Sequence, residues 1–132
     1  NLNSFLTTGM DNLFNLYTHG NINLHFDVDS IEIDVDKAIP LGLLVNEVAL
    51  NTIKYAFPET GKGDFYINLE QSNDTIVLKI WDNGIGLPKG FDVFNSNSLG
   101  FIIIRNLTQQ LDAELVILDD ISGFGVELII PY

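Results

Sequence analysis

The chain has 132 residues, a formal net charge of −12 and no cysteine. Its 46 % hydrophobic residues and nine Phe suffice for the core of one domain, which excludes extensive disorder. The lack of cysteine excludes disulfides and thiolate metal sites, and the acidic charge disfavours a nucleic-acid partner. The chain does not begin with Met and has no apolar run of membrane-spanning length. We therefore expect a fragment of a larger protein that does not itself contact a membrane.

The first third of the chain predicts one helix and two strands. Apolar residues recur at three- and four-residue steps over residues 1–17, which predicts an amphipathic helix ending near Gly20. The residues of this apolar stripe are Leu2, Phe5, Leu6, Met10, Leu13, Phe14 and Tyr17. Alternation of apolar and polar residues predicts a strand over residues 22–28 and a second short one over 31–35.

A long helix is predicted from residue 36 to about Phe57. Asp36 is its expected N-cap, and Pro40 is tolerated in a first turn because N–H groups there need no helical partner. Pro58 and Gly61 are expected to end this helix.

The remaining elements complete an α+β pattern. Strands are predicted over residues 64–71 and 75–81, joined by a hairpin at 72–74. A polar loop with four spaced Gly and Pro residues, 84–98, leads to a helix over 100–111. Strands over 113–118 and 126–130 flank a turn at 119–125. We expect a two-layer sandwich, a mixed and mainly antiparallel sheet covered on one face by about three helices.

A polar stripe marks the long helix as a candidate site. Glu47, Asn51 and Lys54 are spaced four and three apart, so their side chains share one face, with Asn46 and Tyr55 at its edges. Carboxylate and amide oxygens suit Mg²⁺, and an ammonium suits phosphate. Taken alone, the stripe is explained more simply as a solvated face with a Glu–Lys pair. Two Asn within six residues favour a function, because Asn is a poor former of helix interiors.

Two glycine-containing segments are further candidates. Asp82 ends a predicted strand and could accept from an exocyclic amine, while Gly84 and Gly86 would let a flat ring approach the backbone. Taken alone, this segment is explained more simply as an ordinary turn. Gly100 begins a helix whose N–H groups could face phosphate, but Ser98 there is also a good N-cap.

Together and in this order, these segments resemble the GHKL superfamily of ATP-binding domains, which share the Bergerat fold. Residues 40–58, PLGLLVNEVALNTIKYAFP, resemble the N-box of one histidine-kinase subfamily. Residues 82–87, DNGIGL, resemble its first glycine box, and residues 98–101, SLGF, resemble the second. Gln109, Gln110 and Leu111 and the closing Gly-x-Gly hairpin also fit. The resemblance covers nearly the whole chain.

The resemblance implies the ATP-binding catalytic domain of a sensor histidine kinase. Such a domain transfers the γ-phosphate of ATP to a His on a separate dimerisation domain of the same protein, a homodimer acting on a response regulator in two-component signalling. Residues 1–19 would join this domain to the dimerisation segment. A cytoplasmic location is implied, with the membrane topology of the parent left open.

The resemblance also assigns roles to individual residues. Asn51 would hold Mg²⁺ against the phosphates and, with Glu47 as general base, would be catalytic. The residues implied to bind nucleotide are Asn51, Lys54, Tyr55, Asp82, Gly84, Gly86, Leu87, Ser98, Leu99 and Gly100. Within this set, Lys54 would contact phosphate, Tyr55 would lie near the nucleotide ring and Asp82 would accept from the adenine amine.

Some positions have a more specific expectation. Residues 88–97 would form a short lid with Phe91 and Phe94 as apolar anchors and Lys89 as a phosphate contact. Val126 stands where many relatives carry a Thr that helps bind the adenine-side water, which puts that contact in doubt. His19 and His25 are not in a phosphoacceptor context and are expected to be structural or surface residues.

Three other functions share parts of this pattern. A serine kinase of the anti-sigma type has the Glu-x-x-x-Asn helix and a short lid, but the Pro-Leu-Gly-Leu lead and the Lys54-Tyr55 pair favour the histidine kinase. An ATP-hydrolysing clamp would need a longer lid and a transducer domain. A nucleotide sensor without catalysis would not need the full set of polar side chains.

Overall fold

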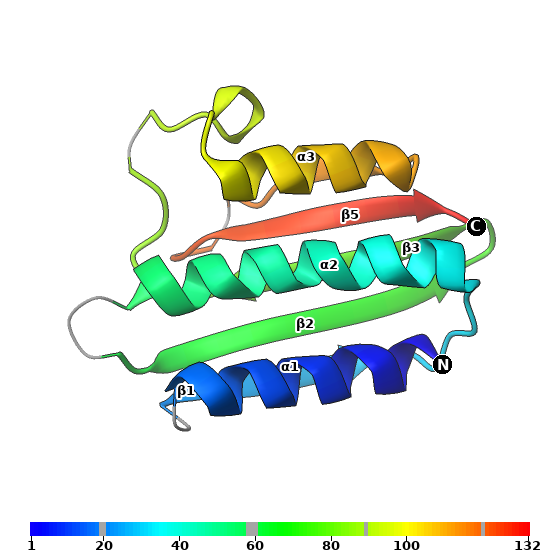
Figure 1. Ribbon diagram of the computed structural model, residues 1–132, viewed down its shortest axis with the longest axis horizontal. Helices are drawn as coiled ribbons and strands as arrows, with labels where there is room; N and C mark the ends of the chain where they lie inside the picture. Colours follow the sequence, from blue (N-terminus) through cyan, green and yellow to red (C-terminus); the bar gives the residue numbers. More distant parts are fainter. Residues whose placement is uncertain (19–20, 58–60, 89, 120) are drawn as a thin grey trace.

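A computed structural model describes residues 1–18, 21–57, 61–88, 90–119 and 121–132 of the chain. The elements are α1 (Leu2–Thr18), β1 (Ile22–Val28), α2 (Val35–Asn51), a π-helical turn (Thr52–Ala56), β2 (Gly63–Ser72), β3 (Thr75–Asp82), a 3₁₀ turn (Val93–Asn95), α3 (Leu99–Gln110), β4 (Glu114–Ile117) and β5 (Gly125–Pro131). They form two layers, a five-stranded sheet with α1, α2 and α3 on one face (Figure 1). The predicted α+β two-layer sandwich is confirmed.

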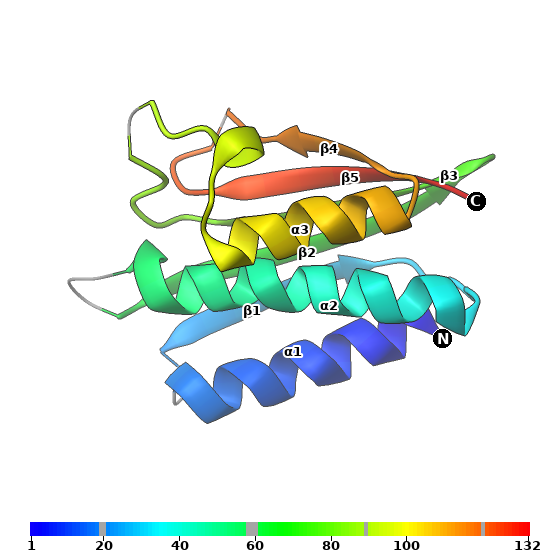
Figure 2. The ribbon, with the colours of Figure 1, turned by 45° about the horizontal axis from the view of Figure 1, so that its top comes forward.

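The sheet is mixed, in the order β1-β2-β3-β5-β4. β1 and β2 are parallel, because the connection between them crosses the sheet through α2. The other three pairs are antiparallel, and β2 and β3 form the predicted hairpin, with Ser72 opposite Thr75. Figure 2 shows the three helices side by side in the order α1, α2, α3.

The core lies between the two layers. Strand residues that face the helices are buried and alternate with residues on the open face, as the period of two requires. From the sheet the core takes Phe65, Ile67, Leu69, Ile76, Leu78, Ile80, Val126, Leu128 and Ile130. From the helices it takes Leu2, Leu6, Met10, Phe14, Leu41, Leu44, Val45, Val48, Ala49, Phe101, Ile104 and Leu107. Phe5 and Tyr17 of the predicted stripe are exposed at its edge.

The strand predicted over residues 31–35 is wrong. This segment leaves the sheet after Asp29, whose N–H still donates to the carbonyl of Leu69, and crosses to the helical layer. Ile31 is buried there and its carbonyl accepts from Leu2, so the alternation reflects burial of one side chain without strand pairing.

The start of α2 also differs from the prediction. The N-cap is Asp34, not Asp36, and its carbonyl accepts from the N–H groups of Lys37 and Ala38. Pro40 therefore lies in the second turn, inside the helix and buried. Asp36 falls in the first turn, where a negative charge is favourable beside the N-terminal end of the helix dipole.

The end of the long helix is not α-helical. The α-helix ends at Asn51, and residues Thr52–Ala56 form a π-helical turn, which sequence periodicity did not predict. Phe57 accepts from the N–H of Gly61, which has φ of 65° and lies near the predicted end. Pro58, His19, Gly20 and Lys89 lie outside the described residues.

The fold makes a direct prediction about its sheet core. Leu78 is 0 % exposed in the central strand β3, so Leu78→Ala should lower the free energy of unfolding by ~2–5 kcal/mol. Leu16 is 69 % exposed on α1, and Leu16→Ala should change the free energy of unfolding by less than about 0.5 kcal/mol. Urea unfolding of both variants checks this pair. Equal effects would contradict the assigned packing.

Candidate nucleotide site

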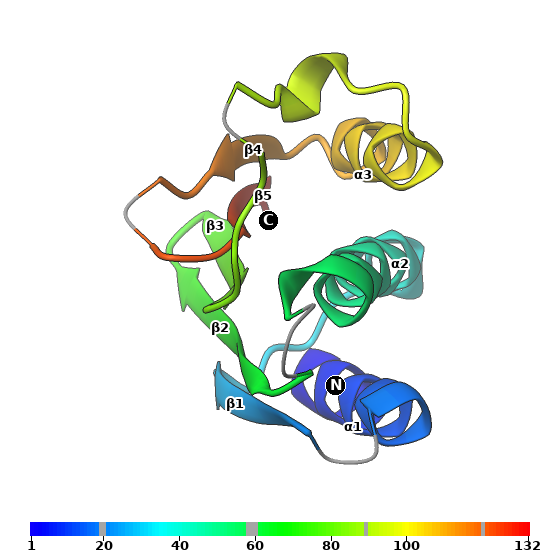
Figure 3. The same ribbon diagram turned by 90° about the vertical axis from the view of Figure 1, so that its left-hand side faces the viewer.

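The candidate residues gather at one end of the sandwich. The end of α2, the start of α3 and the loop that follows β3 all lie at the left of Figure 1, and this end faces the viewer in Figure 3. Both termini lie at the opposite end. The end of α2 and the start of α3, far apart in the sequence, thus lie at the same end of the sandwich.

Two N-box side chains meet the start of α3. A Cβ atom placed on Gly100 would lie 3.5 Å from Oε2 of Glu47 and 3.6 Å from Oδ1 of Asn51. Glu47 and Asn51 are both half-buried, one helical turn apart on α2. The amide nitrogen of Asn51 is buried and has no hydrogen-bond partner among the described residues. Buried polar atoms in proteins are ordinarily hydrogen-bonded, so this nitrogen is still able to donate to a ligand.

Asp82 is the most connected side chain of the site. Its carboxylate is 2 % exposed and accepts three hydrogen bonds. Oδ2 accepts from the hydroxyl of Thr52 at 2.9 Å, and Oδ1 accepts from the N–H groups of Gly84 at 2.9 Å and Phe124 at 3.2 Å. These donors come from the π-helical turn, the loop after β3 and the turn before β5. The carboxylate is therefore fixed in position with part of the accepting capacity of Oδ2 still available.

Glycine is required where the loop meets these neighbours. A Cβ atom on Gly84 would collide with the carbonyl oxygen of Ala56, which itself accepts from the N–H of Ile85 at 3.0 Å. A Cβ atom on Gly123 would collide with the carboxylate of Asp82. A simple turn at Asp82 does not account for these contacts, because the segment is packed against two other segments.

The π-helical turn separates two groups of predicted residues. Thr52 and Ala56 are buried towards Asp82 and the loop, whereas Lys54 and Tyr55 are exposed. Sequence reasoning placed Lys54 on one α-helical face with Asn51, but the wider π turn changes the direction in which residue 54 projects. Among the described residues, no hydrogen bond or ion pair joins Lys54 to Glu47 or Asn51.

The second glycine box begins α3 as an ordinary capped helix. Ser98 is the N-cap, and its hydroxyl accepts from the N–H of Phe101. Leu99 is exposed, and the N–H groups of Leu99 and Gly100 belong to the first turn, which has no helical acceptors. The capping alternative is therefore confirmed for Ser98, and it leaves the start of α3 able to face an anion.

The lid differs from the prediction in its anchor. Phe91 and Phe94 are 40 % and 53 % exposed, and the buried residue between them is Val93. Phe91 still contacts α3, with its ring centroid 5.4 Å from that of Phe101. Leu87 is half-buried at the start of this segment.

Several site residues were missed by sequence reasoning. Thr52, Gly123 and Phe124 complete the surroundings of Asp82, and Arg105 contacts the lid. Gly123 lies in the closing Gly-x-Gly segment, so that sequence pattern could have marked it as a site residue. Thr52 gave none, because a single Thr within an apolar helix does not indicate a buried partner.

The loop after Asp82 is tied to β2 by Asn83. Its side-chain oxygen accepts from the N–H of Asp64 and its amide donates to the Asp64 carboxylate, both at 2.9 Å. Nε2 of His25 lies 2.8 Å from the other Asp64 oxygen, and this hydrogen bond holds the pKa of the Asp64 carboxyl below its usual value. His25 also stacks on Tyr66, so it has the structural role expected of it.

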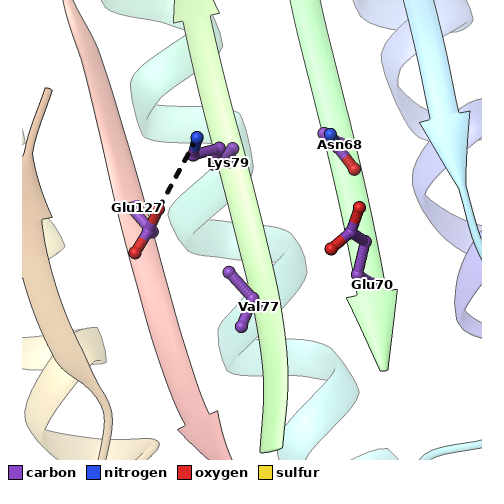
Figure 4. Close-up of a pocket in the computed structure, with 5 residues that line it drawn as sticks. All are labelled: Asn68, Glu70, Val77, Lys79 and Glu127. Atoms are coloured by element: carbon purple, nitrogen blue, oxygen red, sulfur yellow. Dashed lines mark ion pairs between the residues drawn. The ribbon is translucent and has the colours of Figure 1, made fainter. Parts of the chain in front are cut away.

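Two other features of the described residues lie apart from this site. The described ranges contain no cluster of three or more His, Cys, Asp or Glu that could hold a metal ion, and no helix in them is long and apolar enough to cross a membrane. A shallow pocket lies on the open face of the sheet, where Lys79 pairs with Glu127 (Figure 4). None of the predicted site residues lines it.

The fold and site define a class of ATP-binding domain, and the family comparison agrees. Residues 36–131 match the family described as histidine kinase-, DNA gyrase B- and HSP90-like ATPase. The chain belongs to this family, so the predicted superfamily is confirmed. Membership supports ATP as the ligand of the site.

Individual relatives are sensor histidine kinases. The chain is 32 % identical over 113 residues to blue-light-activated histidine kinase 2 of Erythrobacter litoralis, covering 85 % of this chain and 33 % of that protein. It is 36 % identical over 85 residues to the sensor histidine kinase PdtaS of Mycobacterium tuberculosis, covering 63 % of this chain and 17 % of that protein. The chain thus spans a third or less of the length of these relatives.

Solved structures agree with the fold. The histidine kinase domain of a blue-light-activated histidine kinase from Erythrobacter litoralis has a TM-score of 0.89 at 29 % identity, covering 98 % of this chain and 60 % of that one. The catalytic domain of histidine kinase ThkA has a TM-score of 0.79 at 18 % identity, covering 99 % of this chain and 94 % of that one. The second likeness concerns the fold alone.

The Asp64 contacts predict a pH-dependent stabilisation. Because the folded pKa of Asp64 lies below its unfolded value of about 3.9, the contribution is present above that pH and is lost as the pH falls through the folded pKa. Asp64→Asn should lower stability at pH 6 by up to about 1 kcal/mol, and the difference from wild type should shrink below about pH 4. Urea midpoints across this range measure it.

A double-mutant cycle with His25→Ala isolates the pair. The effect of Asp64→Asn should be smaller when His25 is absent, since the strongest partner of the carboxylate is gone. A difference between Asp64→Asn and wild type that does not change with pH would contradict this assignment.

Proposed function

We propose that this chain is the ATP-binding catalytic domain of a sensor histidine kinase, which transfers the γ-phosphate of ATP to a His on a dimerisation domain. The observation that carries the proposal is the arrangement of two groups at the same end of the sandwich. The buried Asp82 carboxylate lies on one side, and Glu47 and Asn51 meet Gly100 at the start of α3 on the other. The names of the relatives support the same reaction.

Asp82 is suited to the adenine base. Its Oδ1 is occupied by two backbone N–H groups, while Oδ2 accepts only the Thr52 hydroxyl among the described residues. Oδ2 can therefore accept from the exocyclic amine of adenine. Gly84 and Gly86 would shape the wall against which the flat ring lies, and Leu87 and Tyr55 would border it. Val126 is buried in the sheet core at this position and supplies no hydroxyl.

The residues present fit a Mg²⁺ ion that arrives with the nucleotide. Mg²⁺ in nucleotide sites takes one or two protein oxygens together with phosphate oxygens and water. The Asn51 carboxamide supplies such an oxygen, and its amide nitrogen, which has no partner among the described residues, could donate to a phosphate oxygen. Bound in this way, the metal would neutralise charge on the phosphates. Lys54 and the N–H groups of Leu99 and Gly100, in the first turn of α3, would add to that neutralisation, with the N-cap Ser98 beside them.

Glu47 is placed to act on the attacking group. Its carboxylate lies beside Asn51 and against Gly100, at the edge of the proposed phosphate position. We propose that Glu47 accepts a proton from the attacking group, or polarises it, while the rest of the site holds the γ-phosphate. Phosphoryl transfer depends mainly on positioning and charge neutralisation, and both are provided by rigid elements here.

The wider setting follows from the same proposal. α1 would continue from the dimerisation segment, the parent would be a homodimer acting on a response regulator, and the domain would be cytoplasmic. The supporting observations are the kinase names of the relatives and the small share of their length that this chain spans.

The adenine contact predicts a defined loss of affinity. Asp82→Asn can keep the fold, because Oδ1 still accepts two N–H groups and the new amide can donate to the Thr52 hydroxyl. The new N–H would oppose the adenine amine, so ATP affinity should fall by ~1–3 kcal/mol. Calorimetric titration measures the affinity, and a melting curve confirms folding. The control Asp27→Asn changes an exposed carboxylate of β1 and should leave ATP affinity unchanged.

The N-box predicts a separation between binding and transfer. Asn51→Ala removes the proposed metal ligand, so nucleotide should bind with reduced Mg²⁺ dependence and transfer to a supplied His-containing dimerisation domain should fall by about 100-fold or more. Glu47→Ala should lose about 100-fold or more in transfer while its ATP binding still depends on Mg²⁺. Full transfer by Asn51→Ala would refute the metal role and restore the solvated-face explanation.

A further inference from the structure

The lid is attached to α3 at a single buried point. Of its described residues, 88 and 90–97, only Val93 is buried, at 3 % exposed. The neighbouring Asp92 shapes the short 3₁₀ turn, because its carboxylate accepts from the N–H of Phe94 at 2.9 Å and from the side-chain amide of Asn95 at 2.6 Å. These bonds lie within the lid. They stabilise its shape but do not hold it to the rest of the domain.

Arg105 supplies the polar attachment. It lies in the second turn of α3, and its Nη1 donates to the carbonyl of Val93 at 2.8 Å. It is the only arginine of the chain. Within the described ranges its guanidinium pairs with no carboxylate, although the chain carries 18 acidic residues. The guanidinium is thus directed at the lid backbone, in a part-buried place where a hydrogen bond is worth more than at the surface.

The same attachment keeps a row of rings in contact. Phe91 lies against Phe101 at 5.4 Å between centroids, and Phe101 meets Phe124 edge-on at 5.9 Å. The backbone of Phe124 then exchanges two hydrogen bonds with Asp82, one to its carboxylate and one from its N–H. Packed contacts therefore run without a break from the lid to the proposed adenine pocket.

We propose that Arg105 is a positioning residue that holds the lid on α3 before nucleotide binds. By fixing the Val93 carbonyl, Arg105 keeps the Phe91 ring in contact with Phe101. It also reduces the number of conformations that the lid samples before nucleotide binds. A segment ordered in advance loses less entropy when its ligand arrives, so affinity rises. The lid position rests on the contacts above, and its consequence for ATP rests on the proposed function.

The test compares Arg105→Met with Arg105→Lys. Methionine keeps an unbranched apolar stem but cannot donate, whereas lysine can donate to the same carbonyl. In the nucleotide-free protein, amide hydrogen exchange over residues 91–97 should speed up about three- to ten-fold in Arg105→Met, the fold-change expected for one lost hydrogen bond. Exchange in β2 and β3 should not change. Arg105→Lys should restore part of the protection.

Kinetics provide the second readout. In phosphotransfer to a supplied His-containing dimerisation domain, Arg105→Met should raise the KM for Mg²⁺-ATP about three- to ten-fold and change kcat less. Arg105→Lys should bring the KM part of the way back to the wild-type value. Lys79→Met is the matched control, since it removes one positive charge on the open face of the sheet, away from the lid. It should change neither lid exchange nor KM.

Two outcomes would overturn the proposal. Unchanged lid exchange with weaker ATP binding would make Arg105 a phosphate ligand. Faster exchange throughout the sheet would make it a residue of general stability. Failure of the wild type to bind ATP would instead refute the proposed function, and the exchange experiment would still decide the role of Arg105 because it uses no nucleotide.

Discussion

The architecture of this site depends on one buried carboxylate. A charge placed out of water is costly unless its hydrogen bonds are made, and Asp82 obtains them from three segments that are otherwise unconnected in sequence. The Thr52 hydroxyl joins it to the helical layer, and the Gly84 and Phe124 N–H groups join it to two loops of the sheet. The residue proposed to recognise the base is therefore also the junction between the layers. If the proposal holds, binding and folding are coupled at this carboxylate.

The surroundings of the site resolve an apparent conflict in charge. A chain with a net charge of −12 is a poor general attractor for an anionic nucleotide. The proposed site would act locally, since Lys54 is exposed in the turn that follows Asn51, and Gly100 at the start of α3 lies next to the Asn51 side chain. Binding would then depend on short-range contacts and on the metal that accompanies the phosphates, more than on long-range attraction.

Much of the fold was readable from the sequence because its strands have one buried face. The strand pattern located β1, β2, β3, β4 and β5, and the resemblance of the N-box and first glycine box marked Asn51 and Asp82 as candidate site residues. The failures have physical causes. Residues 31–35 alternate because Ile31 is buried, although the segment does not pair. The choice of Asp34 over Asp36 as N-cap depends on where the chain enters the helical layer. Val93 is buried beside larger Phe residues because the 3₁₀ turn sets their directions.

The π-helical turn Thr52–Ala56 has a further consequence, for how this segment can change during evolution. It lets Thr52 and Ala56 face the interior while Lys54 and Tyr55 project outwards. Exchanging an outward side chain leaves the backbone path intact. Losing one residue from the turn would rotate everything after it by about 100°, the step of one helical residue. It would also move the Ala56 carbonyl away from Ile85. Homologous sequences should therefore keep the length of this turn.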